Sequence, residues 1–315
     1  MRLGQRDAET RGYPEGFADN PGEGVVPPLR VTSLRTTFKR RDGGSAEVVR
    51  DVSFTLQRGQ TLMLLGESGS GKSVTVRSIL RLYGKNAAIT GSVTMNSKEL
   101  LDLPEHEMRS LRGGQIALVP QDPTGALDPL RKIGSQISEV LLVHRMATTR
   151  RSASRRALEL LDLVGIREPA KVAASFPHEL SGGMRQRAVI AIAVSCDPQV
   201  LIADEPTSAL DVTVQAQILE LIADLRRKTG TAVLMVTHDV GVAADHGDQV
   251  AVMYAGRLVE AGPARDVLRN PTHAYTAGLL AAQPRPGVPR GTLPTMAGWS
   301  AADFEKELVK EAVPT

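Results

Sequence analysis

Gly66-Glu67-Ser68-Gly69-Ser70-Gly71-Lys72-Ser73 is the stretch that decides the fold of this chain of 315 residues. The apolar run 62–65 precedes it, and residues 74–80 follow it with helical spacing. This order predicts a buried strand, a glycine-rich loop and a helix that runs from Lys72 to near Gly84. Phosphate groups bind where such a loop joins a strand to a helix, so the stretch predicts an α/β fold of the P-loop type.

The residue types within this loop fit the chemistry of a bound phosphate. Glycines at 66, 69 and 71 allow backbone conformations in which successive N–H groups point toward one anion. The N-terminus of the following helix adds unpaired N–H groups and a positive dipole end. Lys72 is expected to contact the β- and γ-phosphates, and the Ser73 hydroxyl to ligate Mg²⁺. A surface loop that matches the pattern by chance is the alternative, and other stretches must decide.

Composition restricts the class of protein. The chain has 38 basic and 35 acidic residues and a net charge of +3, which does not favour a nucleic-acid partner. Its single cysteine, Cys196, excludes an intrachain disulfide framework and a cysteine-rich metal cluster. No apolar run approaches the roughly 18 residues that span a bilayer, and no secretory h-region begins the sequence. We therefore expect a cytosolic protein that reaches a membrane only through a partner.

The N-terminal part predicts an extension and a small sheet. Residues 1–29 are rich in Gly, Pro and charge and are expected to be disordered. From Leu29 to Leu56, β-like runs alternate with a polar turn, which predicts an antiparallel sheet beside the phosphate loop. Phe38 lies within this sheet, and its ring either stacks on a purine or packs against the sheet. The sequence favours neither alternative.

Three later apolar strands end on polar side chains, namely Gln121 after 116–119, Asp204 and Glu205 at the end of 200–205, and His238 after 231–237. Ligands of parallel α/β sheets bind at the carboxyl ends of the strands, so we expect these side chains to meet at one edge.

Each of these side chains has an expected role. Asp204 is predicted to hold the Mg²⁺ shell, and Glu205 to orient and deprotonate the hydrolytic water. Gln121 is placed to reach the metal or the attacking water. His238 is expected to donate to the γ-phosphate or to hold Glu205 and the water in line.

Residues 128–178 have helical rather than strand spacing, with helices expected over 133–146 and 153–164. This pattern predicts a helical insert in the α/β core. At its end, Ser181-Gly182-Gly183 opens another apolar helix and forms a second anion site by the same physics. A structural helix cap alone would need the serine but not both glycines.

Five stretches in this order resemble the motifs of the ATP-binding subunits of ABC transporters: the Walker A loop 66–73, the Q-loop at Gln121, the signature 180–187, Walker B at 200–205 with the D-loop 208–211, and the H-loop at His238. The resemblance covers residues 30–265. It implies a P-loop NTPase of the ABC type, with a RecA-like core, an antiparallel β subdomain and a helical subdomain at about 128–185.

The resemblance also implies partners and a mechanism. The family works as a dimer in which ATP on one subunit's Walker A loop is covered by the other's signature, so Ser181 and Gly183 are expected to act in trans. Gly182 of the signature and Asp211 of the D-loop are also expected to bind the nucleotide. ATP and Mg²⁺ are the implied ligands. The implied partners are a second ATP-binding subunit, two transmembrane permease subunits and, indirectly, an extracytoplasmic solute-binding protein. The implied location is the cytoplasmic face of the cell membrane.

A narrower resemblance concerns the cargo. Residues 119–129, 176–179 and 270–280 are similar to those of dipeptide and oligopeptide importers, which implies that 266–315 is the C-terminal extension of that subfamily. Some relatives carry a cysteine cluster there for an iron–sulfur centre, but this segment has no cysteine. A short closing helix is expected after Ser300.

Two alternatives stay open. Relatives with the same motifs transport nickel, glutathione, sugars or cationic peptides, and no residue of an ATPase subunit touches the solute. A soluble ABC ATPase acting on DNA or ribosomes is the second alternative. Such proteins usually have two ATPase domains or a long coiled-coil insert, and this sequence has one domain and no heptads.

Overall fold

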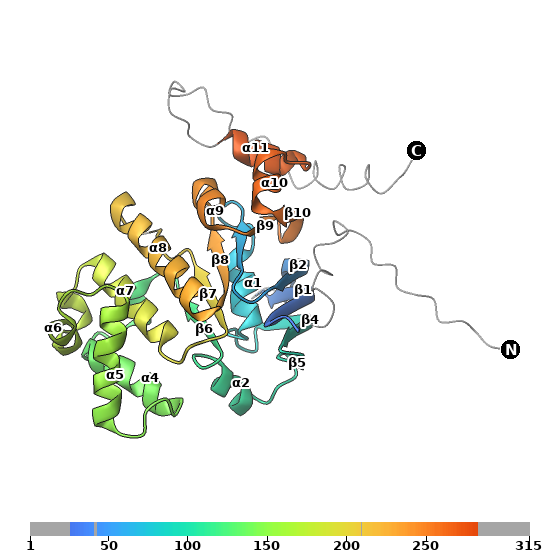
Figure 1. Cartoon of the computed structure of the whole chain (residues 1–315). Coiled ribbons are helices and arrows are strands. Elements are labelled where there is room, and N and C mark those ends of the chain that lie inside the picture. The colour runs from blue at the N-terminus through green and yellow to red at the C-terminus, as the bar shows by residue number, and fades with distance from the viewer. Residues whose placement is uncertain (1–25, 41–42, 209, 283–315) are drawn as a thin grey trace, which may run out of the picture.

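The computed structural model describes residues 26–40, 43–208 and 210–282, and its two β-sheets are joined by helices (Figure 1). The predicted closing helix after Ser300 lies outside the described residues, as do residues 1–25 of the predicted disordered extension. The prediction was wrong for the last residues of that extension, because residues 27–29 are buried and β1 begins at Leu29. Among the described residues, no helix combines the length and the apolar character that crossing a membrane requires.

The larger sheet has six strands in the order β10-β9-β3-β8-β7-β6. Strands β9, β3, β8, β7 and β6 run parallel, and β10 is antiparallel to β9. Their bounds are β3 (Thr61–Leu65), β6 (Ile116–Val119), β7 (Val200–Asp204), β8 (Ala232–Thr237), β9 (Gln249–Tyr254) and β10 (Arg257–Pro263).

The apolar runs of these strands are continuous because both faces of the sheet are covered. In β7, Leu201 and Ala203 pack into a core formed with the helices, whereas Val200 and Ile202 pack into a second core on the opposite face. The second core lies between the two sheets. The sequence prediction of buried parallel strands is thus confirmed.

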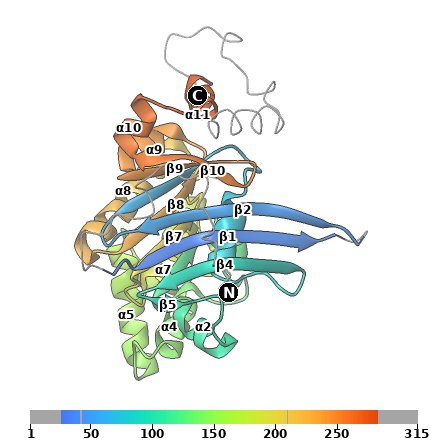
Figure 2. The same ribbon diagram turned by 90° about the vertical axis from the view of Figure 1, so that its right-hand side faces the viewer.

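The smaller sheet is antiparallel, as predicted, with the order β2-β1-β4-β5 (Figure 2). It is formed by β1 (Leu29–Lys39), β2 (Ser45–Leu56), β4 (Ala87–Met95) and β5 (Lys98–Glu99). Helix α1 (Lys72–Ile79) contacts β1 and β2 on one side and β7 on the other. The helix that follows the glycine-rich loop therefore lies between the two sheets.

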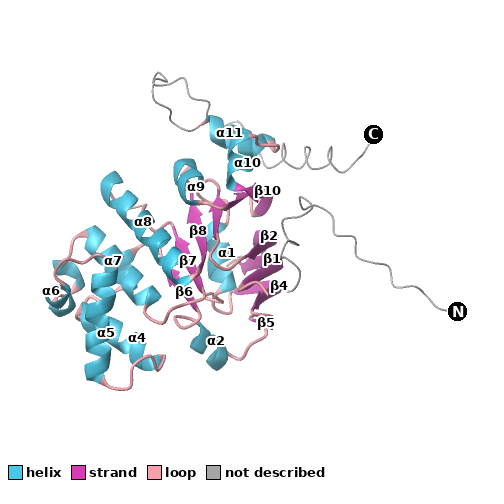
Figure 3. Cartoon of the chain, in the orientation of Figure 1, coloured by secondary structure: helices cyan, strands magenta, loops and turns pink. Residues whose placement is uncertain are grey.

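Most helices lie either on the face of the large sheet opposite α1 or in a separate lobe (Figure 3). This helical lobe contains the predicted insert, residues 128–178, with α4 (Ile133–Val143), α5 (Arg150–Leu163) and α6 (Pro169–Ala174). The remaining helices are α2 (Glu105–Leu111), α3 (Pro123–Ala126), the 3₁₀ turn η1 (Pro177–Glu179), α7 (Gly182–Val194), α8 (Val212–Thr229), α9 (Val240–His246), α10 (Ala264–Arg269) and α11 (Ala274–Ala281).

Two predicted boundaries in the lobe were wrong by about one turn. Helix α4 ends at Val143 rather than Met146, because Arg145 adopts a positive φ of 59° that an α-helix does not allow. Helix α5 begins at Arg150 rather than Ala153. There the Thr149 hydroxyl accepts a hydrogen bond from the Ser152 N–H at 3.1 Å, a capping interaction that starts the helix earlier.

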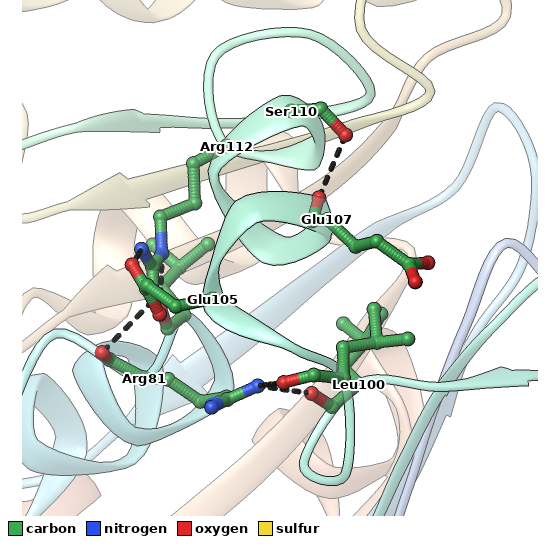
Figure 4. A network of polar contacts seen from close by, with 8 residues as sticks. Arg81, Leu100, Glu105, Glu107, Ser110 and Arg112 are labelled. Atoms are coloured by element: carbon green, nitrogen blue, oxygen red, sulfur yellow. Dashed lines mark hydrogen bonds and ion pairs between the residues drawn. The ribbon is translucent and has the colours of Figure 1, made fainter.

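The predicted end of α1 near Gly84 was also wrong. The helix stops at Ile79, and Arg81 adopts a φ of 51°. The Leu80 and Arg81 carbonyls accept hydrogen bonds from Arg112, at 2.7 and 3.1 Å, in place of helical partners (Figure 4). Glu105 pairs with the same guanidinium at 2.6 Å. Arg112 thus joins the C-terminal end of α1 to the segment that leads into β6.

We predict that Arg112→Met lowers the free energy of unfolding by about 1–3 kcal/mol, because the two carbonyls lose a charged donor. Urea unfolding followed by circular dichroism measures this loss. Arg109→Met, an exposed position on the preceding helix, is the control and should change stability by less than about 0.5 kcal/mol. Equal losses in the two variants would contradict the assigned role of Arg112.

Candidate functional site

The phosphate loop 66–73 connects β3 to α1, as predicted. Two of its glycines are required by close contacts with the backbone. A Cβ at Gly66 would lie 2.2 Å from the Met253 carbonyl oxygen. A Cβ at Gly71, where φ is +107°, would lie 3.1 Å from the Val48 carbonyl oxygen. The loop is therefore held between β2 and β9 and accepts no larger side chain at these positions.

Lys72 is buried inside this loop although it carries an ammonium group. Its Nζ donates to the Gly66 carbonyl at 2.8 Å and to the Glu67 carbonyl at 2.7 Å. Burial lowers the pKa of Lys72, and the nearby carboxylates of Glu205 and Asp204 partly raise it again. The positive charge lies where the loop can present it to an anion.

Ser73 and Asp204 meet although they are 131 residues apart in the sequence. The Ser73 hydroxyl donates to Asp204 Oδ1 at 2.8 Å, and an Arg77 guanidinium nitrogen lies 4.0 Å from Oδ2. Asp204 is almost completely buried, and burial raises its pKa, while the hydrogen bond from Ser73 lowers it. A hydroxyl and a carboxylate side by side are the hard oxygen donors that Mg²⁺ prefers, so this pair fits the predicted ion.

Glu205 follows β7 directly and forms the centre of a second polar cluster. Its Oε2 accepts a hydrogen bond from Gln121 Nε2 at 3.0 Å and lies 3.3 Å from His238 Nδ1. The structure thus brings together three side chains that the sequence predicted from separate strand ends. They meet because β6, β7 and β8 are neighbours and run parallel, which places their carboxyl ends at one edge.

The Glu205 backbone has a φ of +47°, an uncommon conformation for a residue with a side chain. Its N–H donates to the Val236 carbonyl at 3.1 Å, so the neighbouring strand holds this conformation. Glu205 lines a polar pocket of about 100 Å³, and Thr207, Ser208 and His238 are among the other lining residues. A small polar molecule such as water has room beside Glu205.

The predicted second anion site lies at the start of α7. Ser181 caps the helix, and its hydroxyl accepts from the Met184 N–H at 3.3 Å. A Cβ at Gly183 would lie 2.8 Å from Val214 Cγ1, so this glycine also allows α7 to approach the start of α8. Gly182 has no such close contact. In the described part of the chain, no hydrogen bond or ion pair joins residues 181–183 to the phosphate loop of the same chain.

Two other predicted ligand residues have local packing partners. Asp211 caps α8, because its carboxylate accepts from the Val214 N–H at 3.0 Å. Phe38 is half-buried and lies edge-on against Tyr83, with ring centroids 4.9 Å apart. Helix capping by Asp211 and ring packing by Phe38 are structural roles that need no ligand. Contact of either residue with a nucleotide stays a prediction.

Family models match two parts of the chain. The ABC transporter model matches residues 49–208, which includes the phosphate loop, Gln121 and Glu205. The chain belongs to the ABC transporter family. The model of the oligopeptide/dipeptide transporter C-terminal region matches residues 259–306 of this ABC protein.

Known proteins agree with this assignment. The oligopeptide transport ATP-binding protein OppD of Salmonella typhimurium is 49% identical over 257 residues, 82% of this chain and 76% of the relative. The dipeptide transport ATP-binding protein DppD of Lactococcus lactis is 48% identical over 81% of this chain and 73% of the relative. The dimeric ATP-binding cassette MJ0796, solved with ADP and phosphate, has a TM-score of 0.67 and 28% identity, and the match covers 75% of this chain and 99% of that one.

As a member of the family, this chain is an ABC ATPase that binds ATP, and its fold is that of the ABC cassettes. The matched residues 49–208 include the loop around Lys72 and the polar cluster around Glu205, and the part of each in this chemistry stays a prediction. Two residues near the loop were missed at the sequence level. Arg77 lies beside Asp204, and Tyr275 of α11 contacts Glu67. Helical spacing could have indicated Arg77, which lies one turn after Ser73 on α1, whereas no local pattern relates Tyr275 to the loop.

We predict that Gly66→Ala in this ABC protein weakens ATP binding at least about 10-fold and lowers the free energy of unfolding by about 2–4 kcal/mol. The reason is the clash of the new methyl group with the Met253 carbonyl, which forces strand β9 or the loop to move. Titration with a fluorescent ATP analogue and urea unfolding measure the two effects.

Gly59→Ala is the matched control. Gly59 also has a positive φ, of 68°, but a methyl group at this position would have no neighbouring atom within 4 Å. The variant should cost only about 1–2 kcal/mol of backbone strain and leave ATP affinity unchanged. Normal ATP binding by Gly66→Ala would refute the constraint on the loop.

Proposed function

We propose that this ABC ATPase energises the import of dipeptides or oligopeptides. The carboxylate of Glu205, held by Gln121 and His238 beside the phosphate loop, is the observation that carries the catalytic part. The match of residues 259–306 to the oligopeptide/dipeptide transporter C-terminal region supports the cargo class. The names of the relatives, which are oligopeptide and dipeptide transport proteins, support the same cargo.

In the proposed mechanism, the loop 66–73 surrounds the phosphates of ATP and Lys72 neutralises charge on the β- and γ-phosphates. Ser73 and Asp204 would hold Mg²⁺, with Gln121 as a further oxygen donor. The ion would supply electrostatic stabilisation of the phosphate oxygens. These residues bind the nucleotide and neutralise its charge, but none of them activates water.

Activation of water is the role we assign to Glu205. Its Oε2 already accepts from Gln121 and lies near His238, so two neighbouring side chains hold the carboxylate, and Glu205 is also one of the residues that line the adjoining pocket. A carboxylate in hydrogen-bond reach of a water molecule can orient it for in-line attack on the γ-phosphorus and accept its proton. His238 is assigned to the γ-phosphate and to the orientation of Glu205.

The working unit is proposed to be a dimer in which Ser181, Gly182 and Gly183 contact ATP bound to the partner. The start of α7 offers unpaired N–H groups to an anion, yet residues 181–183 have no hydrogen bond to their own phosphate loop in the described chain. ATP bound to a partner subunit in the opposite orientation would accept hydrogen bonds from these N–H groups. The related cassette MJ0796 is a dimer in its solved structure.

We assign residues 30–265 to the ATP-binding domain and 266–315 to the C-terminal extension. Two permease subunits would contact the helical lobe, where Leu130, Val143 and Met146 expose 84%, 69% and 48% of their surface. Exposed apolar side chains of this size favour a protein partner. The protein would then lie at the cytoplasmic face of the membrane, with an extracytoplasmic binding protein delivering the solute.

The experiment that tests transport is affinity purification of the tagged protein from gently solubilised membranes of its native host. We expect two multi-span membrane proteins to copurify, and a soluble peptide-binding protein to join them when they are reconstituted. A tagged Leu130→Glu and Val143→Glu double variant is the control and should lose the membrane proteins while keeping ATP affinity. Recovery with ribosomes or nucleic acid instead would overturn the transport proposal.

For the chemistry, we predict that Glu205→Gln keeps ATP binding and lowers ATP turnover about 100-fold or more, because the amide keeps the size of the side chain but cannot accept a proton. ATP-bound dimers should accumulate, which size-exclusion chromatography detects. Phosphate release measures the turnover. Unchanged turnover would refute the role of Glu205.

Lys72→Ala is the contrasting variant. It removes the ammonium while the glycine backbone remains, so ATP affinity should fall about 10- to 100-fold. The ATP-dependent dimer should then be absent at nucleotide concentrations that dimerise Glu205→Gln. Normal affinity in Lys72→Ala would count against the phosphate loop as the nucleotide site.

A further inference from the structure

The phosphate loop is contacted by a residue from a distant part of the chain. Tyr275 of α11 is completely buried, and its hydroxyl accepts a hydrogen bond from the Glu67 N–H at 3.4 Å. The two residues are 208 positions apart. The C-terminal segment 270–281 therefore reaches the second residue of the loop that binds phosphate.

The position of Tyr275 is set by a chain of contacts. Its ring packs on Tyr254 of β9, with centroids 4.3 Å apart, and its N–H donates to His273 Nδ1 at 3.1 Å. Glu260 is buried and its carboxylate accepts from the Thr272 N–H and hydroxyl and from the His273 N–H, at 2.8, 2.9 and 3.2 Å. Separating a buried carboxylate from three donors is energetically costly, so these hydrogen bonds hold Thr272 and His273 against β10.

The peptide unit that joins Gly66 to Glu67 is held from both sides. The N–H of this unit belongs to Glu67 and donates to the Tyr275 hydroxyl. The carbonyl of this unit belongs to Gly66 and accepts from Lys72 Nζ at 2.8 Å. A peptide unit is planar and rigid, so the orientation of its N–H fixes the orientation of its carbonyl. The hydroxyl of Tyr275 thus acts on the same peptide unit as the ammonium group that is assigned to the phosphates.

We propose that Tyr275 is a positioning residue of the nucleotide site, through which the C-terminal segment holds the phosphate loop in its binding conformation. The proposal rests on the proposed function, in which the loop 66–73 and Lys72 bind the phosphates of ATP. Tyr275 does not touch the nucleotide in this proposal, because it acts through the Gly66–Glu67 peptide unit.

The chemistry of the phenol is consistent with this role. Burial raises the pKa of Tyr275 to about 12, so the group stays neutral in the physiological range and its oxygen accepts the N–H without adding negative charge beside the phosphates. Because coupling between two sites is reciprocal, nucleotide binding must also stabilise the docked segment if the segment stabilises the nucleotide site. The proposal therefore has consequences at both ends of the contact.

The test uses the full-length chain carrying Tyr275→Phe, which removes only the hydroxyl. We expect ATP affinity, measured with a fluorescent ATP analogue, to fall about 5-fold. In turnover assays KM should rise by a similar factor, with kcat changed less than 2-fold. Hydrogen exchange should show the Glu67 amide exchanging at least about 10-fold faster in the variant, in the absence of nucleotide.

Thr276→Val is the matched control. Thr276 is completely buried on the same turn of α11, and its hydroxyl has no hydrogen-bond partner in the described structure. The variant should keep the ATP affinity of the unchanged chain and its exchange rate at Glu67. A second variant, Glu260→Gln, loosens the segment without altering the Tyr275 ring and should shift affinity and exchange in the same direction as Tyr275→Phe.

Unchanged affinity and unchanged Glu67 exchange in Tyr275→Phe would overturn the proposal. Equal effects from Thr276→Val would also overturn it, because the loss would then reflect the stability of α11 and not the contact with Glu67. If the unchanged chain binds no ATP, the proposed function fails. Faster Glu67 exchange in Tyr275→Phe would then still support the contact between segment and loop.

Discussion

The hydrogen bond between Ser73 and Asp204 is the interaction on which the arrangement of the site depends. It joins the first turn of α1 to the end of β7, and so connects the helix that follows the phosphate loop to the strand end that precedes Glu205. Arg77 lies beside the same carboxylate one turn further along α1. Because Glu205 directly follows Asp204, this contact also brings the backbone before Glu205 next to α1.

The other constraints act on the two ends of the same helix. At its N-terminal end, the backbone of β9 confines the phosphate loop. Lys72 and Tyr275 also hold the Gly66–Glu67 peptide unit of the loop through its carbonyl and its N–H. At its C-terminal end, Arg112 binds the last carbonyl groups and connects them to the segment before β6. Helix α1 is thus a rigid link between the phosphate loop and the strand that leads to Gln121.

Sequence reasoning predicted most of the site because its residues are marked by local patterns. Gln121, Glu205 and His238 each follow an apolar strand, and their meeting is confirmed. Helix ends were predicted less well. The end of α1 depends on Arg112, which is 32 residues from the Leu80 carbonyl that it binds. The spacing of residues within α1 does not predict that contact.

The sequence by itself determined that this is an α/β protein with a phosphate loop and polar strand ends, since glycine spacing and apolar runs act over a few residues. Only the tertiary structure decided the strand order that makes Asp204 a neighbour of Ser73, and the docking of Tyr275 on Glu67. Those contacts span 131 and 208 residues. They arise from the packing of whole sheets and helices, which no short stretch of sequence encodes.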